Sequence, residues 1–239
     1  DKADGIRRKR QQAIQLADDF LRSVFLDMFG DPVMNSKGWP VNQIKIGLQS
    51  ITSGWSAKGE NTPCNDGGLG VLKISAVTSG TFKPYENKAV NWEAVPANKK
   101  LIFPKRGDLI FSRANTRELV AATCIVQEDR DDVFLPDKLW LVKTDNYQLL
   151  PEFLNFLIWH PKFKELLTSQ ATGTSGSMLN ISKAKFENTE TIFPDLATQN
   201  KFKDIYWKTL ATLESSISSE KKIGDLFDSL SSKAFSGKL

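Results

Sequence analysis

The chain has 239 residues, of which 40% are hydrophobic and 25% are charged, a composition typical of an ordinary soluble protein with one sizeable core. Lysine and arginine number 32 against 28 aspartates and glutamates, so the formal net charge is +4 and the isoelectric point is near 8.9. This mild positive charge permits an anionic partner but does not require one.

Rare residue types exclude whole classes of site. The single histidine, His160, excludes a histidine-rich metal centre, and the cysteines Cys64 and Cys124 are too far apart for metal-type spacing. We therefore predict neither a metal nor a cofactor. No stretch approaches the roughly 18 apolar residues of a membrane span, and the charged N-terminus is unlike a signal peptide. We expect a cytoplasmic protein without membrane contact.

The N-terminal part reads as one helix. From Ala3 to Phe29 there is no proline, and Gly30 and Pro32 follow as typical punctuation after a helix. Its apolar residues recur at helical spacing, which predicts a buried stripe. The members of this stripe are Ala13, Ala17, Phe20, Val24 and Met28, widened by Leu16 and Leu21.

The C-terminal part reads as a longer helix. After Pro194, with Asp195 or Thr198 as N-cap, a helical pattern runs from Gln199 to Phe235 without proline. The predicted stripe consists of Phe202, Tyr206, Leu210, Leu213, Ile217, Phe227, Leu230 and Ala234. A rod of about 55 Å, at about 1.5 Å per residue, is longer than one small domain can cover, so part of the stripe needs a partner helix.

The two helical ends resemble each other. Residues 225–230 (DLFDSL) align with residues 19–24 (DFLRSV), and at the same offset Ala234-Phe235 falls on Met28-Phe29. Chance likeness between two amphipathic helices is one explanation. The other is an internal repeat that places one helical element on each side of a globular insert.

The middle of the chain is rich in short predicted strands and is punctuated by Gly, Pro, Asn and Asp. The candidate strands are Val71–Val77, Asp108–Arg113, Val120–Gln127 and Leu139–Lys143. Pro151 opens a helical stretch that Pro161 breaks and restarts. We predict an α+β fold with boundaries at 1–34 (N-terminal helix), 35–196 (globular domain) and 197–239 (long C-terminal helix).

Catalytic patterns are weak. The glycines at 67–70 match neither a dinucleotide-binding nor a P-loop pattern, and the acidic run 128–132 is typical of a solvated turn rather than of a nuclease site. Ser175 lies between glycines but not in a hydrolase elbow, and His160 is the only histidine that could activate it. We predict that the chain is not an enzyme and keep a Ser175–His160 hydrolase pair as a minor alternative.

Positive charge is concentrated where one strand ends. Residues 97–118 hold six cations and two anions. Four polar residues come close together at the end of this predicted strand: Arg113, Asn115, Thr116 and Arg117. Arginine pairs bidentately with guanine, and asparagine with adenine, in the major groove. The alternative is that Arg113 forms an internal ion pair and Asn115-Thr116 makes a turn.

A second polar segment, residues 168–185, contains two lysines and no acid. Its hydroxyls, amides and glycines beside Lys183 suit contacts to phosphates, with Thr174 and Ser175 as candidates. A flexible polar loop is the alternative explanation.

Taken together, the chain resembles the specificity subunit of type I restriction–modification systems. The likeness covers nearly its whole length and is carried by residues in order along the chain. These are 3–10 (ADGIRRKR) through 28–32 (MFGDP), 107–116 (GDLIFSRANT), 173–182, 194–196 (PDL) leading to Gln199, and 233–239 (KAFSGKL).

The resemblance implies a non-catalytic role in DNA recognition. Such subunits alternate target-recognition domains with long helices, while separate modification subunits methylate adenine and a restriction subunit cleaves DNA. A full subunit carries two recognition domains and this sequence shows one, so we interpret the chain as half of such a subunit, natural or a fragment. The resemblance makes the repeat between the ends more credible and implies two copies that associate through their helices.

The expected partners are double-stranded DNA, the modification subunits, the restriction subunit and a second copy of the chain. The DNA-contacting candidates are Lys58, Lys73, Ser75, Arg113, Asn115, Thr116, Arg117, Thr174, Ser175 and Lys183. The alternative function is a coiled-coil scaffold that binds protein and never touches nucleic acid.

Overall fold

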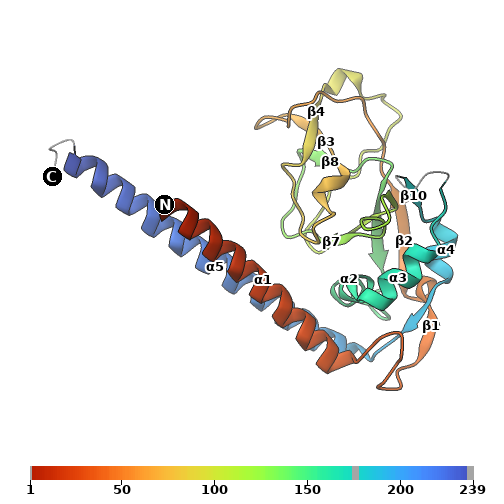
Figure 1. Cartoon of the computed structure of the whole chain (residues 1–239). Coiled ribbons are helices and arrows are strands. Elements are labelled where there is room, and N and C mark those ends of the chain that lie inside the picture. The colour runs from red at the N-terminus through yellow and green to blue at the C-terminus, as the bar shows by residue number, and fades with distance from the viewer. Residues whose placement is uncertain (1, 174–177, 236–239) are drawn as a thin grey trace. The chain divides into compact units, whose positions relative to one another are not determined.

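In the computed structural model, two long helices, α1 (Lys2–Phe29) and α5 (Leu196–Phe235), come before and after a mixed domain of short strands and helices along the chain (Figure 1). The structure describes residues 2–173 and 178–235. It divides into a helical unit, Asp1–Met28 with Lys201–Leu239, and a globular unit, Phe29–Asn200. No helix in the described ranges is long and apolar enough to cross a membrane.

In the helical unit, α1 runs antiparallel alongside α5 (Figure 1). Phe25 meets Phe202 edge-on, with 5.6 Å between ring centroids, and both side chains are buried. At about 1.5 Å per residue the 28 residues of α1 span about 42 Å, and the 40 residues of α5 span about 60 Å. Roughly 18 Å of α5 therefore extends past α1.

The stripe predicted on α1 is partly wrong. Phe20 and Leu16 are about half exposed or more, whereas Phe25, which the predicted stripe omits, is buried together with Leu21. Leu21 and Phe25 lie one turn apart on the face where Phe202 packs, and Phe20 is rotated by about 100° from Leu21. On α5, two members of the predicted stripe, Phe202 and Tyr206, are buried.

The ends of the long helices are capped as the sequence indicates. Gly30 follows α1 with a φ of 75°, a conformation that glycine adopts at little cost. Asp195 caps the start of α5, because its carboxylate accepts the Thr198 backbone N–H at 2.8 Å and the Thr198 hydroxyl at 2.9 Å. These hydrogen bonds lower the pKa of Asp195.

The globular unit is built from short elements. Its strands are β1 (Val41–Gln43), β2 (Leu48–Ser53), β3 (Leu69–Leu72), β4 (Asn87–Val90), β5 (Leu109–Ser112), β6 (Ala114–Asn115), β7 (Thr123–Ile125), β8 (Val133–Phe134), β9 (Leu139–Thr144), β10 (Leu179–Asn180) and β11 (Glu190–Ile192). Its helices are α2 (Pro151–Trp159), α3 (Pro161–Ser169) and α4 (Lys183–Asn188), with 3₁₀ turns η1 (Ile44–Gly47), η2 (Ile74–Ala76) and η3 (Trp92–Ala94).

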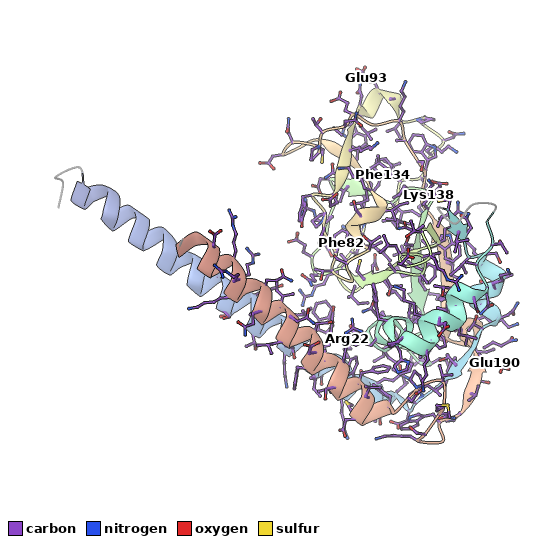
Figure 2. All side chains as sticks on the ribbon, in the orientation of Figure 1. Arg22, Phe82, Glu93, Phe134, Lys138 and Glu190 are labelled. Atoms are coloured by element: carbon purple, nitrogen blue, oxygen red, sulfur yellow. The ribbon has the colours of Figure 1, made fainter. Side chains whose placement is uncertain are left out.

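Two sheets organise this unit. One is antiparallel with the order β2-β9-β5-β7, and the other has the order β4-β3-β8, in which β3 and β8 are parallel. Two small antiparallel pairs, β1-β11 and β6-β10, complete it. In Figure 2, Phe134 of β8 marks the smaller sheet, and Glu93 in η3 lies at the tip beyond it.

The core explains why strand β5 is apolar on both faces. Ile110 joins Leu72, Cys124 and Leu139 in the cluster shared by the two sheets. The next residue, Phe111, points to the opposite face, since alternate residues of a strand do so. There Phe111 stacks on Trp140 at 5.2 Å and meets Phe186 of α4 at 4.8 Å, and all three rings are buried. Because β5 is buried on both faces, its course is fixed, and so is the position of Arg113, which follows its last residue.

The α+β fold class is confirmed, with helices and strands both present and a long C-terminal helix. The strand predicted over Val71–Val77 is wrong after its first two residues. β3 ends at Leu72, and the chain turns into η2, where the N–H of Ala76 bonds to the carbonyl of Lys73 at 3.1 Å. Coiled-coil packing stays a prediction.

Candidate nucleic-acid interface

Three strand ends meet at one edge of the larger sheet. Ser112, the last residue of β5, pairs with Leu139, the first residue of β9, while Ser53 at the end of β2 pairs with Trp140. The chain leaves β5 through Arg113 into β6, which pairs with β10. Figure 2 labels Lys138 at this edge. Segments from distant parts of the sequence therefore converge on one small region.

Arg113 lies at the centre of this region. Its guanidinium Nε donates to the backbone carbonyl of Asp137 at 2.9 Å, and its Nη2 donates to the Asp137 carboxylate at 3.3 Å. Nη1 donates to the side-chain oxygen of Asn180 at 3.3 Å. We call Ser56, Arg113, Asp137 and Asn180 the strand-end cluster. The internal ion pair weighed as an alternative for Arg113 is therefore formed, while base reading by Arg113 stays a prediction.

A turn follows β6 and Thr116. Asn115 accepts the Thr116 backbone N–H at 2.8 Å, and the Thr116 carbonyl accepts the N–H groups of Leu119 and Val120 at 3.1 Å and 2.8 Å. The turn thus lies at residues 117–121, whereas the alternative interpretation placed it at Asn115-Thr116; Asn115 belongs to β6. Arg117 is exposed on it.

The turn also carries a carboxylate. The Glu118 carboxylate has its pKa lowered by its own backbone N–H and by the hydroxyl of Thr116, so it stays ionised. The positive charge of Arg117 is therefore offset locally.

Lys183 reaches the same region from α4. Its ammonium group donates to the backbone carbonyl of Ile51 in β2 at 2.7 Å, and Ser182 caps α4 by accepting the N–H of Lys185. The Lys183 side chain is exposed, and the described residues accept one of its three N–H donors. Thr174 and Ser175 lie outside the described residues.

Three other predicted contacts lie near β3 and β4 in the globular unit. Lys73 and Ser75 both contact Glu86, with a nitrogen–oxygen distance of 3.9 Å for Lys73 and a hydrogen bond of 2.8 Å for Ser75. Lys58 is exposed on a segment that joins β4 through the hydrogen bond between the Glu60 N–H and the Ala89 carbonyl. Lys73 and Ser75 thus contact Glu86 and not the strand-end cluster, whereas Lys58 lies two residues after Ser56 of that cluster.

Part of the positive excess over residues 97–118 is neutralised by the acidic run 128–132. Lys105 pairs with Asp129 at 3.7 Å, and Arg130 pairs with Asp132 at 2.5 Å and Glu128 at 2.9 Å. The Asp132 hydrogen bond is the main reason why the pKa of Arg130 is raised. The acidic run is therefore paired with neighbouring cations, while Glu128, Asp129 and Asp131 stay exposed to solvent.

The groups considered for catalysis have ordinary structural surroundings. Within residues 2–173 and 178–235, no three His, Cys, Asp or Glu side chains gather to hold a metal ion. His160 is partly buried, and burial lowers its pKa. Cys124 is fully buried, and burial raises the pKa of its thiol.

Sequence reasoning missed Asp137 and Ser56, and it counted Asn180 only among the polar residues of the segment 168–185. Asp137 lies two residues before the predicted strand that begins at Leu139, so the sequence indicated a place near a strand end. The sequence could not identify Arg113 as the partner of Asp137, because it does not show that β9 lies between β2 and β5.

Comparison with known proteins adds a family likeness. No family model matches the chain. A curated relative, the specificity subunit of the type I restriction enzyme EcoEI from Escherichia coli, is 24% identical over 165 residues. The match covers 69% of this chain and 27% of that protein. It confirms the resemblance inferred from the sequence.

Solved structures of type I restriction–modification proteins are also similar to this chain. The HsdS subunit from Thermoanaerobacter tengcongensis is 15% identical with a TM-score of 0.49, and the match covers 100% of this chain and 55% of that one. The S subunit of a type I restriction–modification system from M. genitalium is 12% identical with a TM-score of 0.48, covering 93% and 55%. A chain from a study of complex assembly in the type I system is 15% identical with a TM-score of 0.48, covering 100% and 58%. The chain thus spans about a quarter of the curated relative and just over half of each structure.

Proposed function

We propose that this chain, which resembles the specificity subunit of type I restriction–modification systems, recognises a DNA sequence and performs no catalysis itself. The observation that carries the proposal is the convergence of three strand ends on Arg113, together with Lys183 and Arg117. Rigid strands hold these donors at one edge with little ordering cost on binding.

The cations and the polar side chains have separate roles in this proposal. Lys183 and Arg117 contact phosphates, which gives affinity for any duplex and a strong dependence on salt. Arg113 and Asn115 read base edges. The lysines near β3 and β4, Lys58 and Lys73, extend the phosphate contacts along the duplex.

The helical unit spaces the recognition domain and docks partners. The modification subunits supply methylation, and the restriction subunit joins the same assembly. A second copy of the chain associates through the helices, so that each globular unit reads one half of a bipartite site. The greater length of α5, 40 residues against 28 in α1, supports this proposal, because α1 is too short to run along the whole of α5.

DNA-sequence selection with the assembled methyltransferase complex tests the proposal. We expect the bound pool to converge on a two-part sequence with a fixed spacing, which reports specificity and domain separation in one experiment. A pool that stays random, from a complex that still contains this chain, would contradict sequence recognition.

A protein-binding scaffold is the second candidate, and the long paired helices favour it. Salt separates the two functions. Binding to duplex DNA that falls steeply as salt rises supports recognition of DNA, whereas partner binding that needs the helices and ignores salt supports the scaffold.

A further inference from the structure

One residue, Asp137, holds a whole edge of the Arg113 guanidinium. The Nε and Nη2 groups lie along the same side of the planar fork, and both donate to Asp137, one to its carbonyl and one to its carboxylate. This two-point contact fixes the plane of the guanidinium as well as its position.

The opposite side of Arg113 keeps donors for a ligand. Asn180 takes one N–H from Nη1, so the described residues accept three of the five N–H groups of the guanidinium. One N–H on Nη1 and one on Nη2 remain. The side chain is 29% exposed, which gives a partner access to them.

Asp137 is itself held in place. The Ser56 hydroxyl donates to its carboxylate, and its own backbone N–H donates back to the Ser56 oxygen at 3.3 Å. The N–H of Arg113 bonds to the neighbouring carbonyl of Lys138 at 3.1 Å. The backbones on both sides of the ion pair are thus tied together, and the pair is organised before any ligand arrives.

The charge of Asp137 works against general DNA affinity. Its side chain is 45% exposed at the edge where phosphates would approach, and a carboxylate repels them. A carboxylate at this position weakens binding to every sequence, so any contribution of Asp137 to DNA recognition comes from orienting Arg113 and not from general affinity.

We infer that Asp137 is a positioning residue that, assisted by Asn180, orients Arg113 for bidentate pairing with guanine. This inference rests on the proposed function. Guanine presents two acceptors on its major-groove edge, and the two remaining Nη donors of Arg113 match that number. The competing explanation is an ion pair that only joins the ends of β5 and β9, which predicts lost stability with unchanged base preference.

The test compares Asp137→Asn and Asp137→Glu with the unaltered full chain in the assembled methyltransferase complex, using the selected DNA sequence and an unrelated duplex. Asp137→Asn removes the charge, so we expect discrimination at one G·C pair to fall about tenfold. Affinity for the unrelated duplex rises a few-fold at low salt, because one negative charge is gone.

Asp137→Glu keeps the charge but places the carboxylate one methylene further out. Discrimination at the same G·C pair falls, while affinity for the unrelated duplex stays unchanged. Asp131→Asn is the matched control, since it removes the same charge from an exposed side chain and should leave base preference intact. If Asp137→Asn fails to fold by circular dichroism, Asn180→Ala replaces it, with a smaller loss at the same base pair.

The outcomes are separable. If the unaltered chain selects no sequence, the proposed function fails. If it selects one and the folded Asp137 variants keep the full preference at every position, the positioning role is overturned while recognition of DNA stands.

Discussion

The side chain of Gln199 caps helix α2 from the first turn of α5. Its Oε1 accepts the backbone N–H of Leu150 at 2.9 Å, and its Nε2 donates to the carbonyls of Gln148 and Pro194 at 3.0 Å and 2.8 Å. Leu150 is the N-cap of α2 and has no capping group of its own, so Gln199 satisfies a helix N–H that would otherwise be unpaired. Gln199 is fully buried.

Gln199→Ala should therefore destabilise the globular unit by about 2–3 kcal/mol, because it leaves a buried N–H and two carbonyls without partners. Urea denaturation followed by circular dichroism measures the change in the free energy of unfolding. Asn200→Ala is the control, since that exposed amide makes a single bond to the Leu196 carbonyl and its loss should cost less than about 0.5 kcal/mol. Equal effects of the two variants would contradict the capping role of Gln199.

The lowered pKa of Asp31 predicts that the free energy of unfolding depends on pH. Lys162 donates to its carboxylate at 2.6 Å, and the N–H groups of Met34 and Val33 bind its other oxygen. These contacts, with the Lys162 bond the largest cause, lower the pKa of Asp31 to about 2 from its ordinary 3.8. A depressed pKa in the folded state means that the ionised form stabilises the protein above about pH 4, and that this contribution disappears as pH falls toward 2.

Asp31→Asn keeps an acceptor for the two N–H groups but loses the ion pair. We expect a cost of about 0.5–1 kcal/mol at pH 7, since the Lys162 side chain is 56% exposed and solvent screens the pair. Denaturation of both proteins between pH 7 and pH 3 measures the gap. The gap should narrow below pH 4, and a gap that is constant over this range would contradict the ion pair as its source.

Residues that start or end helices made much of the fold predictable from the sequence. Pro151 and Pro161 each open a helix, and Asp195 caps α5, because proline and short polar side chains act on their immediate neighbours. The run Leu109–Ser112 was recognisable as a strand from its composition.

Contacts between distant segments were not predictable. The face of α1 that carries Phe25 is chosen by the position of Phe202, almost the whole chain away. In the same way, Arg113 and Asp137 are separated by 24 residues and meet only because β9 lies next to β5. The candidate cations were therefore visible in the sequence, but their partners depended on strand order.

Arg113→Ala and Lys183→Ala should change DNA binding in different ways. Arg113→Ala weakens binding and relaxes a base preference, with a cost of about 1–3 kcal/mol for a bidentate contact to a base. Lys183→Ala weakens binding to all sequences alike and makes the salt slope shallower by about one unit, since it removes one phosphate contact. Affinities for the selected and an unrelated duplex, measured at several salt concentrations, separate the two effects.

Folding has to be checked for both variants, because Arg113 joins strand ends and Lys183 bonds to the Ile51 carbonyl. Circular dichroism and thermal melting provide this check. Unchanged binding by two folded variants would reject the strand-end edge as the site of DNA contact.

The unequal lengths of the long helices predict self-association. α5 has 40 residues and α1 has 28, so about 18 Å of α5 extends past the helix that runs alongside it. We expect the full chain, without other subunits, to form a dimer at micromolar concentration, with a mass near twice 26.7 kDa by sedimentation equilibrium. Association through apolar helix faces should persist at high salt, which screens charge pairs. A strict monomer across the micromolar range would contradict a two-copy arrangement formed by this chain alone.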